Sequence, residues 1–268
     1  MIRDITIGQY YPADSVIHRL DPRVKLTATL VYIISLFTFK SMTGYLIAGL
    51  FLFTVIKVSK VPFSYIVKGL KAIVILMLIT VVFNLFLTPG EPLVTFWIFS
   101  ISMEGIRTAV FLAIRLIFLI IGASLMTFTT TPNHLTDGLE RIMNPLKKIH
   151  FPVHEIAMMM SIALRFIPIL LEETDKIMKA QMARGADFEN GGLIKKAKNL
   201  IPLLVPLFIS AFRRANDLAM AMEARCYRGG EGRTKMKPLS YKKRDWIGFG
   251  TMVVYLAILF VVTRYLPF

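Results

Sequence analysis

The chain contains one cysteine, Cys226, in 268 residues, which excludes an internal disulfide and a metal site built from cysteines alone. It also lacks a Gly-x-x-x-x-Gly-Lys-Ser/Thr loop, so it is not expected to bind a nucleotide in that manner. His150 and His154 are separated by Pro152 and have no third ligand in sequence, which argues against a zinc site. No convincing nucleophile or acid–base pair is present. The sequence therefore predicts a non-catalytic protein without a metal or cofactor.

Acidic residues are also scarce, with 17 Asp and Glu against 32 Lys and Arg, giving a formal net charge of +15. Hydrophobic residues make up 55% of the chain, above the usual share for a soluble domain. The excess of basic residues could be a nucleic-acid footprint, but the apolar runs are too long for that reading. They favour a protein of the lipid bilayer whose basic residues collect on the cytoplasmic side. No nucleic-acid partner is expected.

Five apolar runs are long enough to consider as transmembrane helices, although the first two are short for a span of roughly 17–25 residues. The chain starts Met-Ile-Arg-Asp without a charged-then-apolar signal sequence, so its own spans are expected to direct insertion. The pattern predicts an all-α, polytopic membrane protein with about five transmembrane helices. The runs lie at about 26–39, 43–58, 72–88, 105–128 and 246–263.

The loops between these runs predict the orientation of the protein. The segment 57–71 contains four lysines, whereas 89–104 contains no Lys or Arg and only Glu91 and Glu104 as charged residues. By the positive-inside rule the first segment is cytoplasmic and the second external, with Lys40 in an external turn as the one exception. We therefore expect a multi-pass protein of the plasma membrane, with a cytoplasmic N-terminus and an external C-terminus.

The composition changes between the fourth and fifth runs and predicts three parts: 1–131, 132–244 and 245–268. In 132–244 charges recur at helical spacing around apolar runs that are too short or interrupted to span, which predicts amphipathic helices on the cytosolic membrane surface. One helix is expected from Pro152 to about Ala183, kinked near Pro168. A second is expected from about Pro206 to Ala224.

One short pattern occurs twice in this part, ending first at Arg184 and then at Arg225. When the two arginines are aligned, Ala183 matches Ala224 and Ala180 matches Ala221. Residues three and four apart share a helical face, so each copy predicts a helix with an alanine stripe and a terminal arginine.

A single arginine at such a position is adequately explained by its interaction with the helix dipole. The repeat favours two further roles. Small residues such as Ala180 and Ala221 allow close packing of helices. The arginines Arg184 and Arg225 would each present a planar set of donors to a groove on a partner.

These motifs resemble the paired Ala-Arg-Gly-type motifs of the transmembrane T component of energy-coupling factor (ECF) transporters, and the resemblance covers nearly the whole chain. Ala183-Arg184-Gly185 matches in full, whereas Ala224-Arg225-Cys226 has cysteine in place of the last glycine. The segment Leu20-Asp21-Pro22-Arg23-Val24-Lys25 resembles the family's Leu-Asp-Pro-Arg-x-Lys segment.

The resemblance implies a subunit that couples ATP hydrolysis by two ABC ATPase subunits to movement of a small membrane-embedded S component, which binds the substrate. Arg184 and Arg225 would each enter a groove on one ATPase. A vitamin-type importer is the favoured reading, and a T component dedicated to a cobalt or nickel importer is the alternative. An autonomous channel or carrier is a different class, in which Arg115, near the middle of the fourth run, would lie in the pathway. A structural pairing of Arg115 inside the bundle is the other explanation.

Overall fold

The computed structural model describes residues 10–39, 41–87, 92–96, 99–186, 188, 192–230, 232, 236 and 238–265. Lys40 and Glu91, which were used to predict the orientation, lie outside the described residues. The chain divides into two compact units. The bundle unit comprises Gly8–Gly138 with Leu239–Phe268, and the two-helix unit contains Leu139–Pro238. The sequence-based division placed the corresponding boundaries at 132 and 244.

The prediction of a helical, polytopic fold is confirmed, and each of the five apolar runs lies in a helix. A short antiparallel hairpin of β1 (Pro92–Phe96) and β2 (Phe99–Ser102) adds to the predicted elements, with Thr95 opposite Ser100. The helices are α1 (Pro22–Thr38), α2 (Met42–Ser59), α3 (Phe63–Leu87), α4 (Met103–Thr129), α5 (Pro132–Met143), the 3₁₀-helix η2 (Asn144–Ile149), α6 (Val153–Ala183), α7 (Leu193–Ala224) and α8 (Lys243–Tyr265).

Within the described residues, four helices are long and apolar enough to cross a membrane: α2, α4, α6 and α8. Among the other expected spans, α1 has 17 residues and α3 holds a shorter apolar stretch, Ile73–Phe86. By length and composition α6 also meets this criterion, although it lies in the part, 132–244, that the sequence predicts to lie on the membrane surface. Pro168 lies inside α6 without ending it, as expected, and the helix has 31 residues.

The predicted bounds of α6 are confirmed, but the predicted start of α7 near Pro206 is wrong. The helix begins at Leu193 and contains both Pro202 and Pro206. Proline was taken as a helix start because it lacks an N–H donor, which costs nothing in a first turn. In α7 the two prolines are four residues apart, and the helix continues through both.

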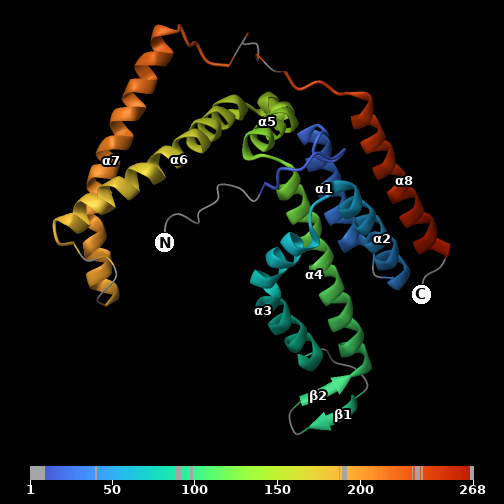
Figure 1. The fold of residues 1–268 in the computed structure, drawn as a ribbon. Coiled ribbons are helices and arrows are strands. Elements are labelled where there is room, and N and C mark those ends of the chain that lie inside the picture. The colour runs from blue at the N-terminus through green and yellow to red at the C-terminus, as the bar shows by residue number, and fades with distance from the viewer. Residues whose placement is uncertain are drawn as a thin grey trace. The chain divides into compact units, whose positions relative to one another are not determined.

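The core of the bundle unit lies where α4 and α8 each pack against both α1 and α2 (Figure 1). The ring centroids of Phe51 and Tyr255 are 4.3 Å apart, and the Tyr255 hydroxyl lies 2.9 Å from the Ser35 hydroxyl. This aromatic contact joins α2, α8 and α1. The buried apolar residues are Tyr32, Leu36, Tyr45, Ala48, Leu52, Val61, Ile66, Ile121, Leu125, Phe128, Met252, Tyr255 and Leu259.

The segment Leu20–Lys25, noted above for its family resemblance, fixes the start of α1. Asp21 is the N-cap residue and accepts a hydrogen bond from the Arg23 backbone N–H at 2.9 Å. The Arg23 guanidinium bonds the same carboxylate at 2.8 Å and stacks 3.8 Å from the Tyr241 ring centroid. Burial alone would raise the pKa of Asp21, but these bonds and the charge of Arg23 outweigh it and hold the pKa below its usual value.

The same segment is tied to two distant parts of the chain. The carboxylate of Asp245, which is 1% exposed, accepts hydrogen bonds from the backbone N–H groups of Asp21 at 2.8 Å and Lys242 at 2.7 Å. The Lys25 ammonium donates to the carbonyl oxygens of Thr129, at the end of α4, and His18, at 2.7 and 3.1 Å. The starts of α1 and α8 and the end of α4 are therefore held together.

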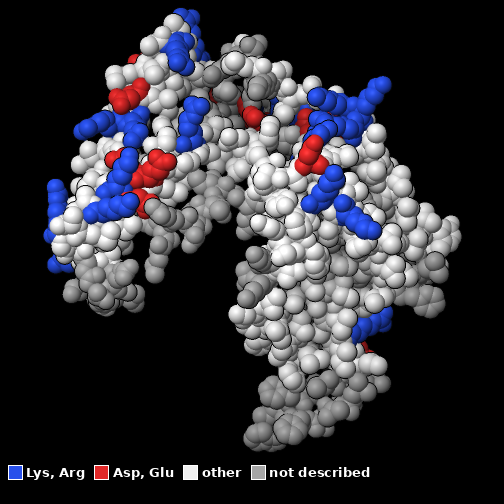
Figure 2. All heavy atoms as spheres, in the orientation of Figure 1, with Lys and Arg blue, Asp and Glu red and all other residues white. Residues whose placement is uncertain are grey.

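Basic side chains gather at this end of the bundle unit, whereas the visible sides of its helices are mostly uncharged (Figure 2). Lys60, just after α2, acts electrostatically on Asp14 in the segment before α1. Arg19, Arg23, Lys242 and Lys243 belong to the starts of α1 and α8. The asymmetry agrees with the charge pattern from which the orientation was predicted.

Arg115 in α4 has a structural partner. Its Nε donates to the Tyr45 hydroxyl at 2.8 Å, and its guanidinium lies 5.4 Å from the ring centroid of Phe37. Tyr45 is buried and its hydroxyl donates in turn to the Leu36 carbonyl oxygen at 3.4 Å. Arg115 therefore connects α4 to α2 and α1.

We expect Arg115→Ala to lower stability by about 1–3 kcal/mol, because it removes a charged hydrogen bond to a buried hydroxyl. Arg107→Ala is the matched control, since Arg107 is exposed on the same helix, and its effect should stay within about 0.5 kcal/mol. Thermal unfolding of the purified chain in detergent measures both. A fully stable Arg115→Ala variant with altered ion permeability in liposomes would instead support a pathway role.

Candidate functional site

The two motif arginines stand at the ends of α6 and α7, which cross in the two-helix unit (Figure 1). Two polar contacts mark the crossing. Arg214 of α7 pairs with Glu173 of α6 at 3.3 Å. The Gln181 amide of α6 donates to the Pro202 carbonyl oxygen of α7 at 3.4 Å. The expectation of two helices, each with an arginine at its end, matches this arrangement.

The contact of Gln181 with Pro202 supplies a donor to a carbonyl that one of the two prolines of α7 leaves without its helical partner. In a regular helix the carbonyl of residue 202 would accept from the N–H of residue 206. Pro206 has no N–H, so the Pro202 carbonyl oxygen loses that donor. The Gln181 side chain supplies a replacement from the neighbouring helix. A proline pair that would weaken an isolated helix thus becomes a point of attachment for α6.

The end of α6 is a complete Schellman turn. The Ala186 N–H bonds the Gln181 carbonyl, and the Gly185 N–H bonds the Met182 carbonyl, both at 3.0 Å. Gly185 has φ +88°, the left-handed conformation that this turn requires. Arg184 is the C-cap, with φ −89° and ψ 6°. The first motif is therefore the terminus of the helix itself.

The end of α7 repeats this turn bond for bond. The Tyr227 N–H bonds the Met222 carbonyl at 3.1 Å, and the Cys226 N–H bonds the Glu223 carbonyl at 2.8 Å. Cys226 takes the left-handed position with φ +54°. Arg225 is the C-cap, with φ −91° and ψ 14°, close to the values of Arg184. The sequence repeat thus corresponds to a repeat of backbone geometry.

All six motif residues are exposed: Ala183, Arg184, Gly185, Ala224, Arg225 and Cys226. Within the described part of the chain, neither Arg184 nor Arg225 forms an ion pair. Ala180 and Ala221 are exposed as well, so they do not mediate the contact between α6 and α7. Their predicted packing role would need a helix from another chain.

The loop after the second motif is held against the start of α6. A Cβ on Gly230 would lie 2.4 Å from Cδ2 of His154, so only glycine fits at that point. The His154 ring is itself oriented by Glu140, with Nδ1 3.0 Å from the carboxylate. Four residues beyond Cys226, the chain is therefore anchored on the ring of His154.

Comparison with known proteins agrees with this geometry. Residues 13–236 match the family model described as cobalt transport protein, CbiQ. The chain is 61% identical over 249 residues to the energy-coupling factor transporter transmembrane protein EcfT of Clostridium kluyveri, covering 92% of each chain. The Bacillus subtilis EcfT is 46% identical over 97% of this chain and 98% of its own length. The chain belongs to the EcfT family.

Membership of the EcfT family makes the chain the energy-coupling transmembrane component of an ECF transporter. This confirms the recognition made from the two arginine motifs. It also decides between the classes left open by the sequence, because an autonomous channel or carrier is not an energy-coupling component. The helical and membrane character of the described structure fits the same family.

Sequence reasoning missed several residues that position these elements. Pro202 and Pro206 carried a usable signal, because a proline frees the carbonyl four residues earlier and predicts a donor from elsewhere. Asp245 resembled an ordinary acidic residue in a first helical turn, and nothing local indicated its bond to the Asp21 N–H. Gly230 could be recognised as a loop residue, but its contact with His154 depends on the tertiary structure.

The two left-handed positions give a prediction about the motif turns. Gly185→Ala adds a Cβ that meets nothing within 4 Å, so its effect is the backbone cost of the left-handed conformation, about 1–2 kcal/mol. Cys226→Gly removes the same cost but increases unfolded-chain entropy, so it should be neutral or stabilise by up to about 1 kcal/mol. Hydrogen exchange of the Ala186 and Tyr227 amides reports each turn directly. Faster exchange after Cys226→Gly would contradict the Schellman geometry.

Proposed function

We propose that this chain links two ABC ATPase subunits to a small substrate-binding S component in the plasma membrane. The observation that supports the proposal best is the duplicated helix end: two exposed arginines on nearly identical backbone turns, neither with an ion-pair partner within the described chain. Two helix ends of the same geometry suit two ATPase subunits with similar grooves. ATP hydrolysis would occur in the partner subunits, and this chain would transmit their closure.

The chemistry of arginine suits such docking. Its guanidinium presents five donors in a plane and can bond a carboxylate or several carbonyl oxygens at the end of a groove. At each helix end the arginine is the C-cap, so its side chain stands at the terminus without a following helical turn to cover it. The hydrogen-bonded turn that follows each arginine would limit how much the helix end can deform when an ATPase subunit moves.

An S component would contact the exposed apolar surface of α6 and α7. Exposed apolar patches of large size mark interaction sites, and methionine adapts to partners of different shape. This property would suit a subunit shared among several S components. The exposed apolar residues of the two helices include Met159, Met160, Ile167, Met182, Leu200, Ile201, Leu204, Val205, Phe208, Ile209, Phe212 and Met220.

The proposed orientation places the N-terminus and the two-helix unit on the cytoplasmic side, where ATP is available. The gathering of basic residues at the starts of α1 and α8 supports it through the positive-inside rule. Vitamin or another micronutrient is the proposed class of cargo. The matching family model is described by cobalt transport, which supports a dedicated cobalt or nickel importer as the second candidate.

Replacing the motif arginines tests the proposal. Truncating one partner of a desolvated charge pair costs about 2–5 kcal/mol, so Arg184→Ala and Arg225→Ala should each greatly reduce ATP-dependent uptake in reconstituted complexes. The double variant should also fail to co-purify the ATPases. Arg→Lys should restore activity only in part, because lysine lacks the planar fork.

Arg228→Ala is the matched control, because Arg228 is exposed and lies three residues beyond Arg225 outside the motif. All variants should unfold at the temperature of the unmodified chain, since a helix-end arginine contributes little to its own helix. The isolated chain should show no ATPase activity. Normal uptake and normal ATPase capture by the double variant would reduce both arginines to helix-dipole interactions and refute the coupling role.

A further inference from the structure

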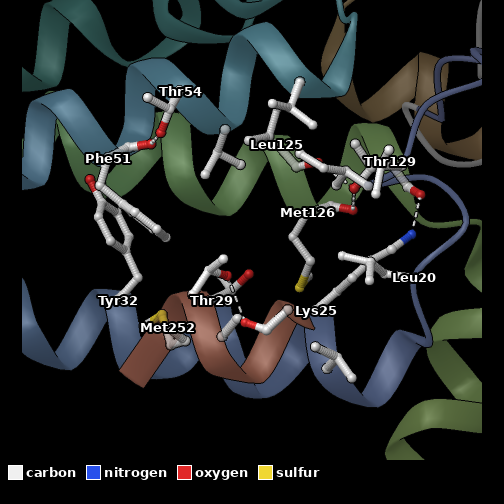
Figure 3. Close-up of a pocket in the computed structure, with 18 of the residues that line it drawn as sticks. Leu20, Lys25, Thr29, Tyr32, Phe51, Thr54, Leu125, Met126, Thr129 and Met252 are labelled. Carbon is white, nitrogen blue, oxygen red and sulfur yellow. Dashed lines mark hydrogen bonds between the residues drawn. The ribbon is translucent and has the colours of Figure 1, made fainter. Parts of the chain in front are cut away.

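The bundle unit contains a cavity of about 380 Å³ between α1 and α2, with α4 and α8 at its sides. Figure 3 shows Tyr32 and Phe51 at one end, and Leu20, Lys25 and Thr129 at the other. Lys25 and Tyr32 are seven residues apart on α1, which corresponds to roughly 10 Å along the helix axis. The cavity is thus an elongated space parallel to the helices.

The walls of the cavity are mostly apolar, and its innermost lining residues belong to the buried core of the bundle unit. Val24, Leu52 and Leu125 line it and are each at most 5% exposed. Protein interiors contain few voids larger than a water molecule, and an apolar void of this kind does not retain water. The volume lies within the range of binding sites for organic ligands. An apolar occupant of elongated shape fits these properties.

One end of the cavity carries positive charge. Lys25 and Arg244 both line it, and the charge of Arg244 acts on that of Lys25. Two of the three ammonium donors of Lys25 are used by carbonyl oxygens. The Arg244 Nε is buried and has no hydrogen-bond partner among the described residues. This end therefore offers donors to an anion, beside a cavity suited to a hydrocarbon chain.

The cavity is open on the side of α2 and α8. Its exposed lining residues are Thr54 and Val58 on α2, Ile247 and Thr251 on α8, and Val16 in the segment before α1. Both helices are long and apolar enough to cross a membrane, so we expect this opening to face lipid rather than water.

We propose that the cavity binds one acyl chain of an anionic phospholipid from the surrounding bilayer, with the lipid phosphate held by Arg244 and Lys25. The bilayer supplies this amphiphile at the opening between α2 and α8. The hydrocarbon chain fills the space up to Tyr32, and the anionic headgroup stays at the basic end, where the helices leave the apolar part of the membrane. The lipid acts as a structural filler that keeps α1 and α2 apart.

Lipid titration of the purified full chain in detergent tests the charged end. Native mass spectrometry should show one dioleoyl phosphatidylglycerol retained, bound at least about tenfold more tightly than dioleoyl phosphatidylcholine. Arg244→Gln should remove most of this preference and weaken phosphatidylcholine binding less, because the choline cation offsets the phosphate charge in that lipid. Lys243→Gln is the matched control, because Lys243 is an exposed neighbour outside the cavity, and its affinities should stay within about twofold of the unmodified chain.

Filling the cavity tests the apolar part. Ala28→Phe places a ring among the lining residues, and Thr251→Phe places one at the opening, on an exposed position. Both should abolish the retained lipid. Equal binding of the two lipids to the unmodified chain, lipid retention by Thr251→Phe, or equal losses in Arg244→Gln and Lys243→Gln would overturn the proposal. The last result would show attraction to the basic surface alone.

Discussion

The left-handed residue after each motif arginine is the constraint on which the two exposed helix ends of α6 and α7 depend. It turns the chain out of the helix at once, so Arg184 and Arg225 become the C-cap residues of α6 and α7. The following two N–H groups close the helix end, and the arginine side chain stands at an exposed terminus. Glycine adopts this conformation without cost, which explains its place in the motif. Cys226 shows that the conformation, rather than glycine itself, is the requirement.

The bundle unit depends on a second constraint, imposed by the charged residues where α1 begins. A hydrocarbon core offers no partners for such groups, so they must be satisfied within the protein or at the membrane surface. Asp21, Arg23 and Lys25 each bond a backbone group or a charge close to them. Asp245 closes the set by bonding the Asp21 N–H from the start of α8. The segment Leu20–Lys25, which carries the family resemblance in the sequence, therefore also joins the start of α1 to the start of α8 and the end of α4.

Local patterns predicted much of the fold because the bilayer restricts the choice of structure. Apolar runs gave the helices, and the alanine–arginine repeat located the ends of α6 and α7. The prediction failed where a tertiary contact overrides a local rule. Pro206 would start a helix in isolation, but Gln181 compensates for its missing N–H in α7. The hairpin of β1 and β2 was not predicted from the sequence.

The candidate site was predictable in its residues but not in its geometry. Sequence spacing identified Arg184 and Arg225 as equivalent, whereas the equality of their backbone angles follows only from the hydrogen bonds of the two turns. The alanine stripe predicted close packing of helices, and the exposure of Ala180 and Ala221 shows that this face is not buried within the described chain.

Site-specific photo-crosslinking tests the central claim most directly. A photoreactive amino acid at position 184 or 225 of the chain, expressed with its partner subunits, reports which protein lies at each helix end. We expect an adduct with an ATPase subunit from both positions and none from position 254, where Val254 is exposed on the apolar helix α8. Adducts with lipid or with a second copy of this chain at both 184 and 225, and none with an ATPase, would contradict it.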